Sequence, residues 1–424
     1  MVEKRKPIPV SDAVGRVMER IHTAETETVR LEQAGGRWLA EPITADEAVP
    51  PFDRSPYDGF AVRAEDTKNA GRENPVTLRV IETVGAGHVA TKTPRPGEAV
   101  RVMTGTIMPQ ETDAVIMFEL TKELSDEEIQ ITRPFEPGDN VVKKGEEMQK
   151  GAEVLPGGER VHAGITAALA TFGYSNVQVR KKPVVGVFAT GTELLEPGDP
   201  LEPGKIRNSN APMVVEQLKE AGAEAVYYGQ LPDEFDLCLS KISGVLEDVD
   251  ALITTGGVSV GDFDFLPAVY EKLEAEVLFN KVAMRPGSVT TVAFQGEKPL
   301  FGLSGNPSAC FVGFELFAAP WLKAAMGAQK PFLQQADAVL GKSFPKPNPF
   351  TRFVRGHAFF YKGKLHAVPA GLDKSQVVTS LAQSNALIVL PGGTRGYEKG
   401  DPVTVFMLRS DGAAEFQEPV KEQT

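Results

Sequence analysis

The chain has few cysteines and histidines, which limits the kinds of metal site it can form. Its 424 residues include two cysteines and five histidines. Cys238 and Cys310 each lie in an apolar helical pattern rather than in a C-x-x-C pair. That context favours small buried side chains over metal ligands, nucleophiles or a disulfide. The histidines show no ligand spacing, so the pattern argues against a structural zinc site.

Long apolar runs and excess positive charge are also missing. The longest apolar run, residues 309–322, is interrupted by Glu315 and Pro320 and is too short to cross a bilayer. The basic N-terminus has no apolar segment behind it, so we expect a cytoplasmic protein that contacts no membrane. A net charge of −12 argues against nucleic acid as a partner, because phosphate backbones require concentrated Lys and Arg. An anionic ligand must therefore be held locally.

The order of sequence patterns predicts a multidomain α/β protein. Residues 1–50 and 143–178 are interpreted as one split helical domain, with an inserted β domain at residues 51–142. Residues 179–329 alternate strand and helix, which predicts a doubly wound, mostly parallel sheet. Short strands return at residues 333–410 and predict a small C-terminal β-barrel domain.

Four helix positions are specific enough to check. Residues 11–22 have an apolar face of helical period, and residues 29–40 form a second helical segment. Asn210 is the expected cap of the helix that follows it. Asn306 is the expected cap of a long helix that begins at Pro307.

Residues 183–310 repeat one device three times: an apolar strand followed by a glycine-rich loop with hydroxyl or acidic side chains. In an open α/β sheet such loops gather at the carboxyl ends of the strands, where ligands bind. The loops offer many backbone amides and few cations. We therefore expect the ligand to be an anion, such as a phosphate or another oxyanion.

The first loop contains Thr190, Gly191 and Glu193. Glycine allows the turn after the strand, and Glu193 could hold a divalent cation at the opening of the cleft. A turn with a solvated glutamate is the simpler reading of this loop alone. Lys205 and Arg207 could supply positive charge nearby, or they are unpaired surface residues.

The second loop carries a stronger signal. Gly256 and Gly257 offer free amides, Ser259 offers a hydroxyl, and Asp262 and Asp264 are two acids spaced two apart. Magnesium prefers carboxylate and water oxygens and commonly bridges to phosphates, so this loop suits a magnesium-phosphate guest. The alternative is that one of the two aspartates caps the next helix.

The third loop opens a helix and follows a strand that ends in Leu303. Helix-opening amides favour a negative group, although a capped core helix explains the same pattern. Arg285 follows another strand and could clamp an oxyanion, whereas an isolated arginine is more often a surface charge. The candidate binding residues of the loop are Ser304, Gly305, Asn306, Pro307 and Ser308.

Nine segments, taken in order, resemble the molybdopterin molybdenumtransferase family, which includes the E-domain of gephyrin. They are RSPYDGFAV, GEAVRVMTGTIMP, TDAVIMFE, KKGEEM, ATGTELLEPG, TTGGVSVGDFD, MRPGSV, GLSGNPSAC and SLAQSNALIVLPGG. Each segment is ordinary alone, but the ordered set is specific and spans about residues 7–408. The resemblance also makes Asp58 and Thr104 candidate site residues. From composition alone, both would be interpreted as turn residues.

The resemblance implies an elongated homodimer whose cleft is completed by the inserted β domain of the partner subunit. It implies an enzyme that takes molybdate and adenylylated molybdopterin, uses Mg²⁺, inserts molybdenum and releases AMP. A molybdopterin adenylyltransferase is the implied substrate donor. Arg285 and Ser308 would meet molybdate or the pterin phosphate. The resemblance also implies which residues are catalytic: Asp58, Thr104, Glu193, Asp262 and Asp264. The last three of these would bind the metal.

Some positions depart from the family pattern and leave a second function open. Thr192 stands where an aspartate is common, Ser288 where a lysine is common, and Ser304 where a proline is common. Asn208 replaces another aspartate, and Glu147 also replaces one. A binding or scaffold protein of the same fold, without turnover, is the alternative to the enzyme.

Overall fold

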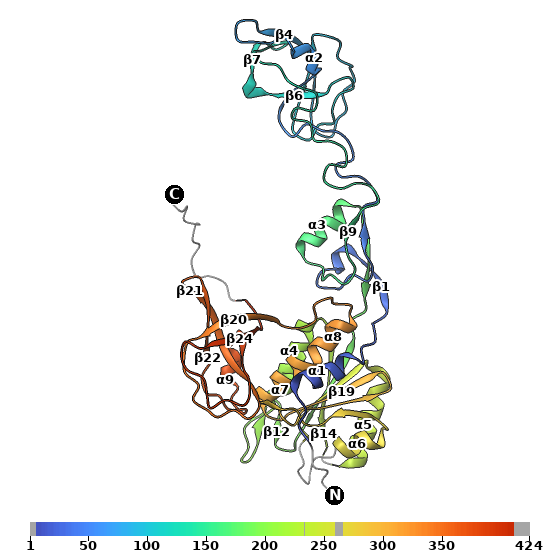
Figure 1. The fold of residues 1–424 in the computed structure, drawn as a ribbon. Helices are drawn as coiled ribbons and strands as arrows, with labels where there is room; N and C mark the ends of the chain where they lie inside the picture. Colours follow the sequence, from blue (N-terminus) through green and yellow to red (C-terminus); the bar gives the residue numbers. More distant parts are fainter. Residues whose placement is uncertain (1–5, 233, 259–265, 411–424) are drawn as a thin grey trace.

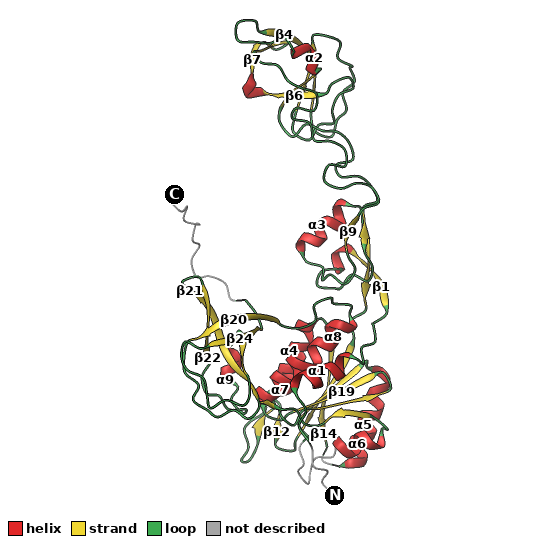
Figure 2. Ribbon diagram, viewed as in Figure 1, coloured by secondary structure: helices red, strands yellow, loops and turns green. Residues whose placement is uncertain are grey.

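The computed structural model describes residues 6–232, 234–258 and 266–410. The molecule is elongated, with an α/β body and a β-barrel side by side at one end (Figure 1). A small body containing α3 lies in the middle, and a β-rich body lies at the far end beyond a narrow connection. Helices gather around the sheet of the α/β body, whereas the far body consists almost entirely of strands and loops (Figure 2).

A six-stranded sheet forms the centre of the α/β body, in the order β14-β11-β15-β19-β18-β16. The first four strands are parallel, and β18 runs antiparallel to both of its neighbours. The predicted doubly wound, mostly parallel sheet is therefore confirmed. The strands are β11 (Val184–Thr190), β14 (Glu224–Leu231), β15 (Ala251–Thr255), β16 (Glu276–Phe279), β18 (Thr291–Gln295) and β19 (Lys298–Leu303).

Helices cover both faces of this sheet, so its central strands are apolar on both sides. Cys310 lies in the core of one face and Cys238 in the core of the other, and both side chains are buried, as predicted. One face is covered by α1 (Val10–Met18), α4 (Asn210–Ala221), α7 (Pro307–Gly313) and α8 (Ala319–Ala325). The other is covered by α5 (Phe235–Asp248) and α6 (Leu266–Lys272).

The N-terminal segment differs from the sequence prediction in two ways. Helix α1 forms as expected, but Ala13 and Val17 are buried in the core of the sheet and not in the split domain. The helix predicted for residues 29–40 is wrong. Residues Thr26–Arg30 form β1, which pairs antiparallel with β10 (Asn176–Arg180). The alternating TETVR pattern fits a strand, and pairing with a distant segment outweighs local helix propensity.

The middle body is built from segments on either side of the far body. Its core joins Leu39 and Ile43 to Ile165 and Leu169 of α3. The ribbon of β1 and β10 connects it to the α/β body. Besides β1 and β10 it contains the helix α3 (Ala163–Thr171) and three short elements. These are a 3-10 turn (Leu31–Gln33), β2 (Ile43–Thr44) and β9 (Glu153–Leu155).

The far body contains a second six-stranded sheet in the order β6-β3-β5-β4-β8-β7. Phe60 and Ile116 are fully buried in its core. Its elements are β3 (Gly59–Val62), α2 (Ala64–Thr67), β4 (Val76–Val84), β5 (Glu98–Val102), β6 (Ala114–Met117), a 3-10 turn (Phe118–Leu120), β7 (Thr121–Ser125) and β8 (Glu128–Ile131).

The C-terminal strands close into a barrel. The order β21-β22-β20-β24-β23 returns to its start because β23 also pairs with β21. A short strand of the α/β body, β17 (Met284–Arg285), adds in parallel to β21 and joins the two bodies. The barrel elements are β20 (Gln334–Leu340), β21 (Thr351–Tyr361), β22 (Lys364–Pro369), α9 (Thr379–Ala382), β23 (Ala386–Leu390) and β24 (Pro402–Met407).

None of the helices in the described part of the chain is long and apolar enough to cross a membrane.

A partly buried acid lies beside α4. The π-helical turn Phe314–Ala318 joins α7 to α8 and carries Glu315. Burial raises the pKa of the Glu315 carboxyl, although Gln217 Nε2 donates a hydrogen bond of 2.7 Å to its Oε1. A raised pKa means that the folded state keeps a proton that the unfolded chain loses above about pH 4.5. The contribution of Glu315 to stability therefore falls as pH rises above that value.

We expect Glu315→Gln to raise the melting temperature at pH 8 by about 2–4 °C, which corresponds to about 1 kcal/mol. The substituted amide can still accept from Gln217 but cannot become charged. The gain should disappear near pH 4, where the native carboxyl is protonated in both states. Thermal unfolding followed by circular dichroism across pH 4–8 checks this, with Glu216→Gln on the exposed side of α4 as control. A gain of the same size at every pH would contradict the prediction.

Candidate functional site

The three glycine-rich loops meet at the carboxyl edge of the α/β sheet, as the sequence predicts. Thr190 Oγ1 at the end of β11 donates to the Thr255 carbonyl at the end of β15, at 3.3 Å. The Gly256 amide donates to the Leu303 carbonyl at the end of β19, at 2.8 Å. A Cβ on Gly305 would lie 3.7 Å from Gly256 Cα. The loops after β11, β15 and β19 are therefore in direct contact.

The second loop needs glycine at two successive positions. Gly256 has φ +106° and Gly257 has φ +68°, a region that other residues rarely adopt. A Cβ on Gly256 would overlap Thr190 Oγ1, and a Cβ on Gly257 would lie 3.1 Å from Leu266 Cδ1. Any side chain here would push the first and second loops apart. Ser259, Asp262 and Asp264 of the same loop lie outside the described residues.

The first loop presents Glu193 at the surface. The Glu193 carboxylate folds back over Gly191, where a Cβ would overlap it. Leu194–Leu195 (β12) and Ile206–Arg207 (β13) pair in parallel just beyond it. Lys205 Nζ donates to the Thr192 carbonyl, so one cation does lie beside this loop. Arg207 instead donates to the Asp199 carbonyl, at 3.2 Å.

The third loop is tied to the barrel. The Ser308 amide donates to the Ser375 carbonyl at 3.0 Å, and Ser308 Oγ donates to the Val377 carbonyl at 2.8 Å. A ligand would have to displace these contacts to reach Ser308. Ser304 is buried, and its Oγ accepts from the Asn306 amide at 3.3 Å.

The helices beside the site are capped differently from the prediction. Asn306 occupies the cap position before Pro307, but its side chain makes no capping hydrogen bond. Asn210 is the first residue of α4, and Asn208 Oδ1 takes the capping role by accepting from the Ala211 amide at 3.2 Å. The Asn210 side chain instead donates to the Gly305 carbonyl at 2.8 Å, which fastens α4 to the third loop.

A cavity of about 290 Å³ opens beside the third loop, between the α/β body and the barrel. Arg285 reaches it from β17 and is exposed, with Ser304 and Asn306 on the same wall. The barrel supplies the opposite wall, with Arg352, Arg355, Asp373 and Ser375. The predicted oxyanion clamp Arg285 therefore faces two further arginines that the sequence reasoning did not select.

Asp58 and Thr104 form a pair of their own in the far body. Asp58 Oδ1 accepts from the Thr104 amide at 2.7 Å and from Thr104 Oγ1 at 2.9 Å. These hydrogen bonds lower the pKa of the Asp58 carboxyl, so it is ionised at neutral pH. Within one chain the far body, marked by α2 and β6, is well separated from the sheet that carries the three loops (Figure 1). A single chain does not bring this pair to the loops.

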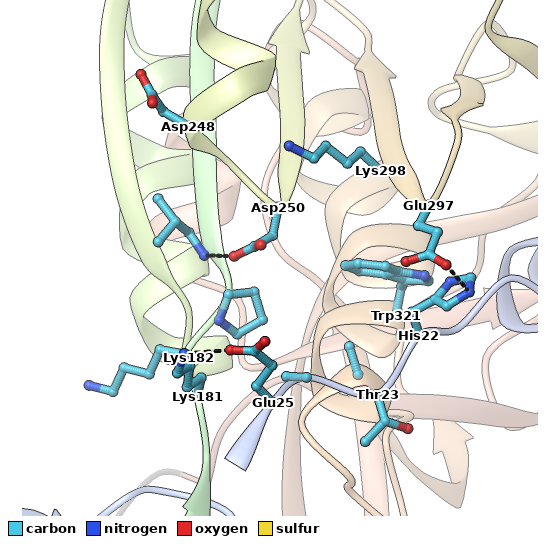
Figure 3. A pocket seen from close by; sticks show the side chains of 14 residues that line it. His22, Thr23, Glu25, Lys181, Lys182, Asp248, Asp250, Glu297, Lys298 and Trp321 are labelled. Carbon is cyan, nitrogen blue, oxygen red and sulfur yellow. Dashed lines mark hydrogen bonds and ion pairs between the residues drawn. The ribbon is translucent and has the colours of Figure 1, made fainter. Parts of the chain in front are cut away.

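A larger cavity, about 510 Å³, lies at the opposite edge of the sheet, where β11, β15 and β19 begin (Figure 3). Its charged groups largely satisfy one another. Lys181 pairs with Glu25 at 2.5 Å, and His22 lies 3.1 Å from Glu297. Asp250 accepts from the Val184 amide at 2.8 Å. With its charges compensated and far from the glycine-rich loops, this cavity is the weaker candidate.

Three family models match successive parts of the chain. Residues 8–173 match the MoeA N-terminal region (domain I and II), residues 186–324 a probable molybdopterin binding domain, and residues 337–408 the MoeA C-terminal region (domain IV). The three loops and Arg285 all fall within the second match. The barrel residues of the 290 Å³ cavity fall within the third.

Whole-length relatives agree with these matches. The molybdopterin molybdenumtransferase of Bacillus subtilis (strain 168) is 58% identical over 98% of this chain and 97% of its own. That of Staphylococcus aureus (strain MRSA252) is 48% identical over 98% of this chain and 99% of its own. A crystal structure of the molybdopterin biosynthesis moeA protein from Pyrococcus horikoshii OT3 superposes with a TM-score of 0.82, at 32% identity, covering 95% of this chain and 100% of that one. This chain therefore belongs to the molybdopterin molybdenumtransferase family, and it is a transferase of molybdenum cofactor biosynthesis.

Proposed function

We propose that the enzyme transfers molybdenum from molybdate into adenylylated molybdopterin in the presence of Mg²⁺ and releases AMP. The observation that carries this proposal is the contact between the three glycine-rich loops beside a cavity with three arginines. Such an edge can hold an extended, multiply charged ligand: backbone donors bind phosphate oxygens, and arginines bind oxyanions in a fixed geometry.

Each part of the site has a distinct task in this proposal. Gly256 and Gly257 let the backbone approach the phosphates, because neither carries a Cβ. Arg285 has no ion pair among the described residues and is free to bind an incoming oxyanion. Ser304 and Asn306 line the same cavity and offer polar groups to the reacting end of the substrate.

Magnesium would neutralise the phosphates of the bound substrate. Glu193 lies in the described part of the chain, at the carboxyl edge of the sheet, where its carboxylate could hold magnesium. The other acids proposed for the metal, Asp262 and Asp264, lie outside the described residues. Among the residues that the structure describes, no group of three His, Cys, Asp or Glu side chains is placed to hold a metal. Glu193 would lie beside the metal in this proposal.

The pair of Asp58 and Thr104 enters this site only from a second copy of the chain. Asp58 is ionised and oriented by two hydrogen bonds, as a group that positions a substrate would be. The pair lies on the far body, away from the loops of its own chain. A two-fold dimer would let each far body reach the partner's loops, so we propose a homodimer with two shared sites. A molybdopterin adenylyltransferase is the proposed donor of the substrate.

We expect the purified protein to release AMP from adenylylated molybdopterin only when both Mg²⁺ and molybdate are present. Glu193→Gln should lower this rate about 10- to 100-fold, the usual effect of removing a group that supports a bound metal. Glu202→Gln, an exposed acid in the same segment, is the matched control and should keep the native rate. The measurement is AMP by chromatography. Tight pterin binding without AMP release would instead favour a binding or scaffold protein.

We expect two variants of low activity to restore activity when they share a dimer. Asp58→Ala removes the acid of the far body and Glu193→Gln removes the acid of the loops. A dimer with one copy of each has one site with both acids intact, so it should show about half the native rate per dimer. Differently tagged chains, co-expressed and purified through both tags, allow the AMP assay. Mixed dimers as inactive as either variant alone would show that each site is built within one chain.

A further inference from the structure

Two arginines from different domains line the 290 Å³ cavity side by side. Strand β17 of the α/β body pairs in parallel with β21 of the barrel, and Arg285 is opposite Arg352 in this ladder. Paired residues project to the same side of a sheet, and both side chains line the cavity. Like charges directly opposite each other are destabilising. The arrangement calls for a negative group between them.

The protein supplies only part of the required negative charge. The charged side chains that line the cavity are Arg285, Arg352, Arg355 and Asp373, so three cations face one carboxylate and two positive charges remain. Lys346 Nζ lies 3.9 Å from the same carboxylate, so the negative charge of Asp373 is shared with a further cation. This local excess stands in a chain whose net charge is −12. The cavity thus has the charge to accept a dianion.

Asp373 divides its two oxygens between two arginines. Its Oδ1 lies 3.3 Å from Arg355 Nη1, and its Oδ2 lies 2.8 Å from Arg352 Nη1. Arg355 is 2% exposed, and it also donates to Ser380 Oγ and to the carbonyls of Leu372 and Lys374. Four of its five N–H donors are therefore used within the barrel.

Arg352 is held but not saturated. Its Nε donates to Asn348 Oδ1 at 3.0 Å, and its guanidinium lies 5.4 Å from the centre of the Phe344 ring. In the described part of the chain no acceptor is recorded for its Nη2. Three contacts therefore fix the direction of this arginine while one nitrogen stays available to a ligand.

We propose that Arg352 is a second anion-binding residue, which with Arg285 binds a doubly charged tetrahedral oxyanion, and that Asp373 is its positioning residue. This inference rests on the proposed function, because it gives the barrel a share in binding the oxyanion of that same site. Two arginine forks on adjacent strands present parallel donors to a tetrahedral group. Asp373 holds Arg352 in place but cannot also neutralise Arg285. The oxyanion is either free, as molybdate, or the end of a phosphate monoester.

The test measures oxyanion binding by the full-length protein with calorimetry, using sodium molybdate in one arm and phenyl phosphate in the other. We expect Arg352→Gln to weaken binding in at least one arm about tenfold, the loss of one charge-assisted contact. Arg352→Lys should recover part of the affinity, because it keeps the charge but not the fork. Arg20→Gln is the matched control: Arg20 also pairs with an acid, Glu276, and stacks on a ring, Phe294.

The two arms identify the source of the oxyanion. Weaker binding of molybdate alone assigns a free oxyanion, and weaker binding of phenyl phosphate alone assigns a monoester. Asp373→Asn should weaken the same ligand and raise the KM of the AMP-releasing reaction more than it lowers kcat, which a purely structural role would not do. Arg352→Gln keeps the Asp373–Arg355 pair, so it remains informative if Asp373→Asn fails to fold.

A folded Arg352→Gln protein that binds both ligands as tightly as the native protein would overturn the inference, as would a native protein that binds neither. Oxyanion binding is measured without the pterin. A protein that binds molybdate through Arg352 but releases no AMP would therefore keep this inference and contradict the proposed function.

Discussion

The close contact of three loops at one edge of the sheet is the constraint on which the site depends. Parallel strands place their carboxyl ends at the same edge, and the order β11-β15-β19 makes the three loops immediate neighbours. The approach is so close that Gly256 has no room for a Cβ beside Thr190. Backbone amides can then converge on one ligand without the entropy cost of ordering long side chains. The same closeness leaves little freedom to replace the glycines.

Charge at the site is local, in contrast to the charge of the whole molecule. A protein with a net charge of −12 repels anions at a distance, but screening limits that field to about 8 Å at physiological salt. Within that range Arg285, Arg352 and Arg355 outweigh Asp373. An anion therefore has to be recognised at contact distance, and shape and donor geometry decide which anion binds.

Local patterns in the sequence predicted the sheet and its loops because each strand carries its own apolar run and its own glycine turn. The same reasoning failed for residues 29–40, where the partner of β1 is β10, about 150 residues further along the chain. It also missed Arg352, whose importance comes from a two-residue ladder between domains. The segment TRFVRG by itself is an ordinary strand sequence. A side chain that matters through a distant neighbour leaves no periodic signal.

The two halves of the proposed site are held together by different forces. Arg285 and Arg352 are fixed to each other by backbone pairing of β17 with β21, so their spacing is a property of one folded chain. Asp58 and Thr104 stand on the far body, beyond the middle body that the β1–β10 ribbon connects to the sheet, and assembly of two chains would bring them to the loops. In the proposed homodimer, oxyanion binding would require a single folded chain, whereas the complete reaction would require both subunits. Dilution that separates the subunits should therefore abolish AMP release before it abolishes oxyanion binding. The reason is that dilution weakens the contact between subunits but not the pairing of β17 with β21 within one chain.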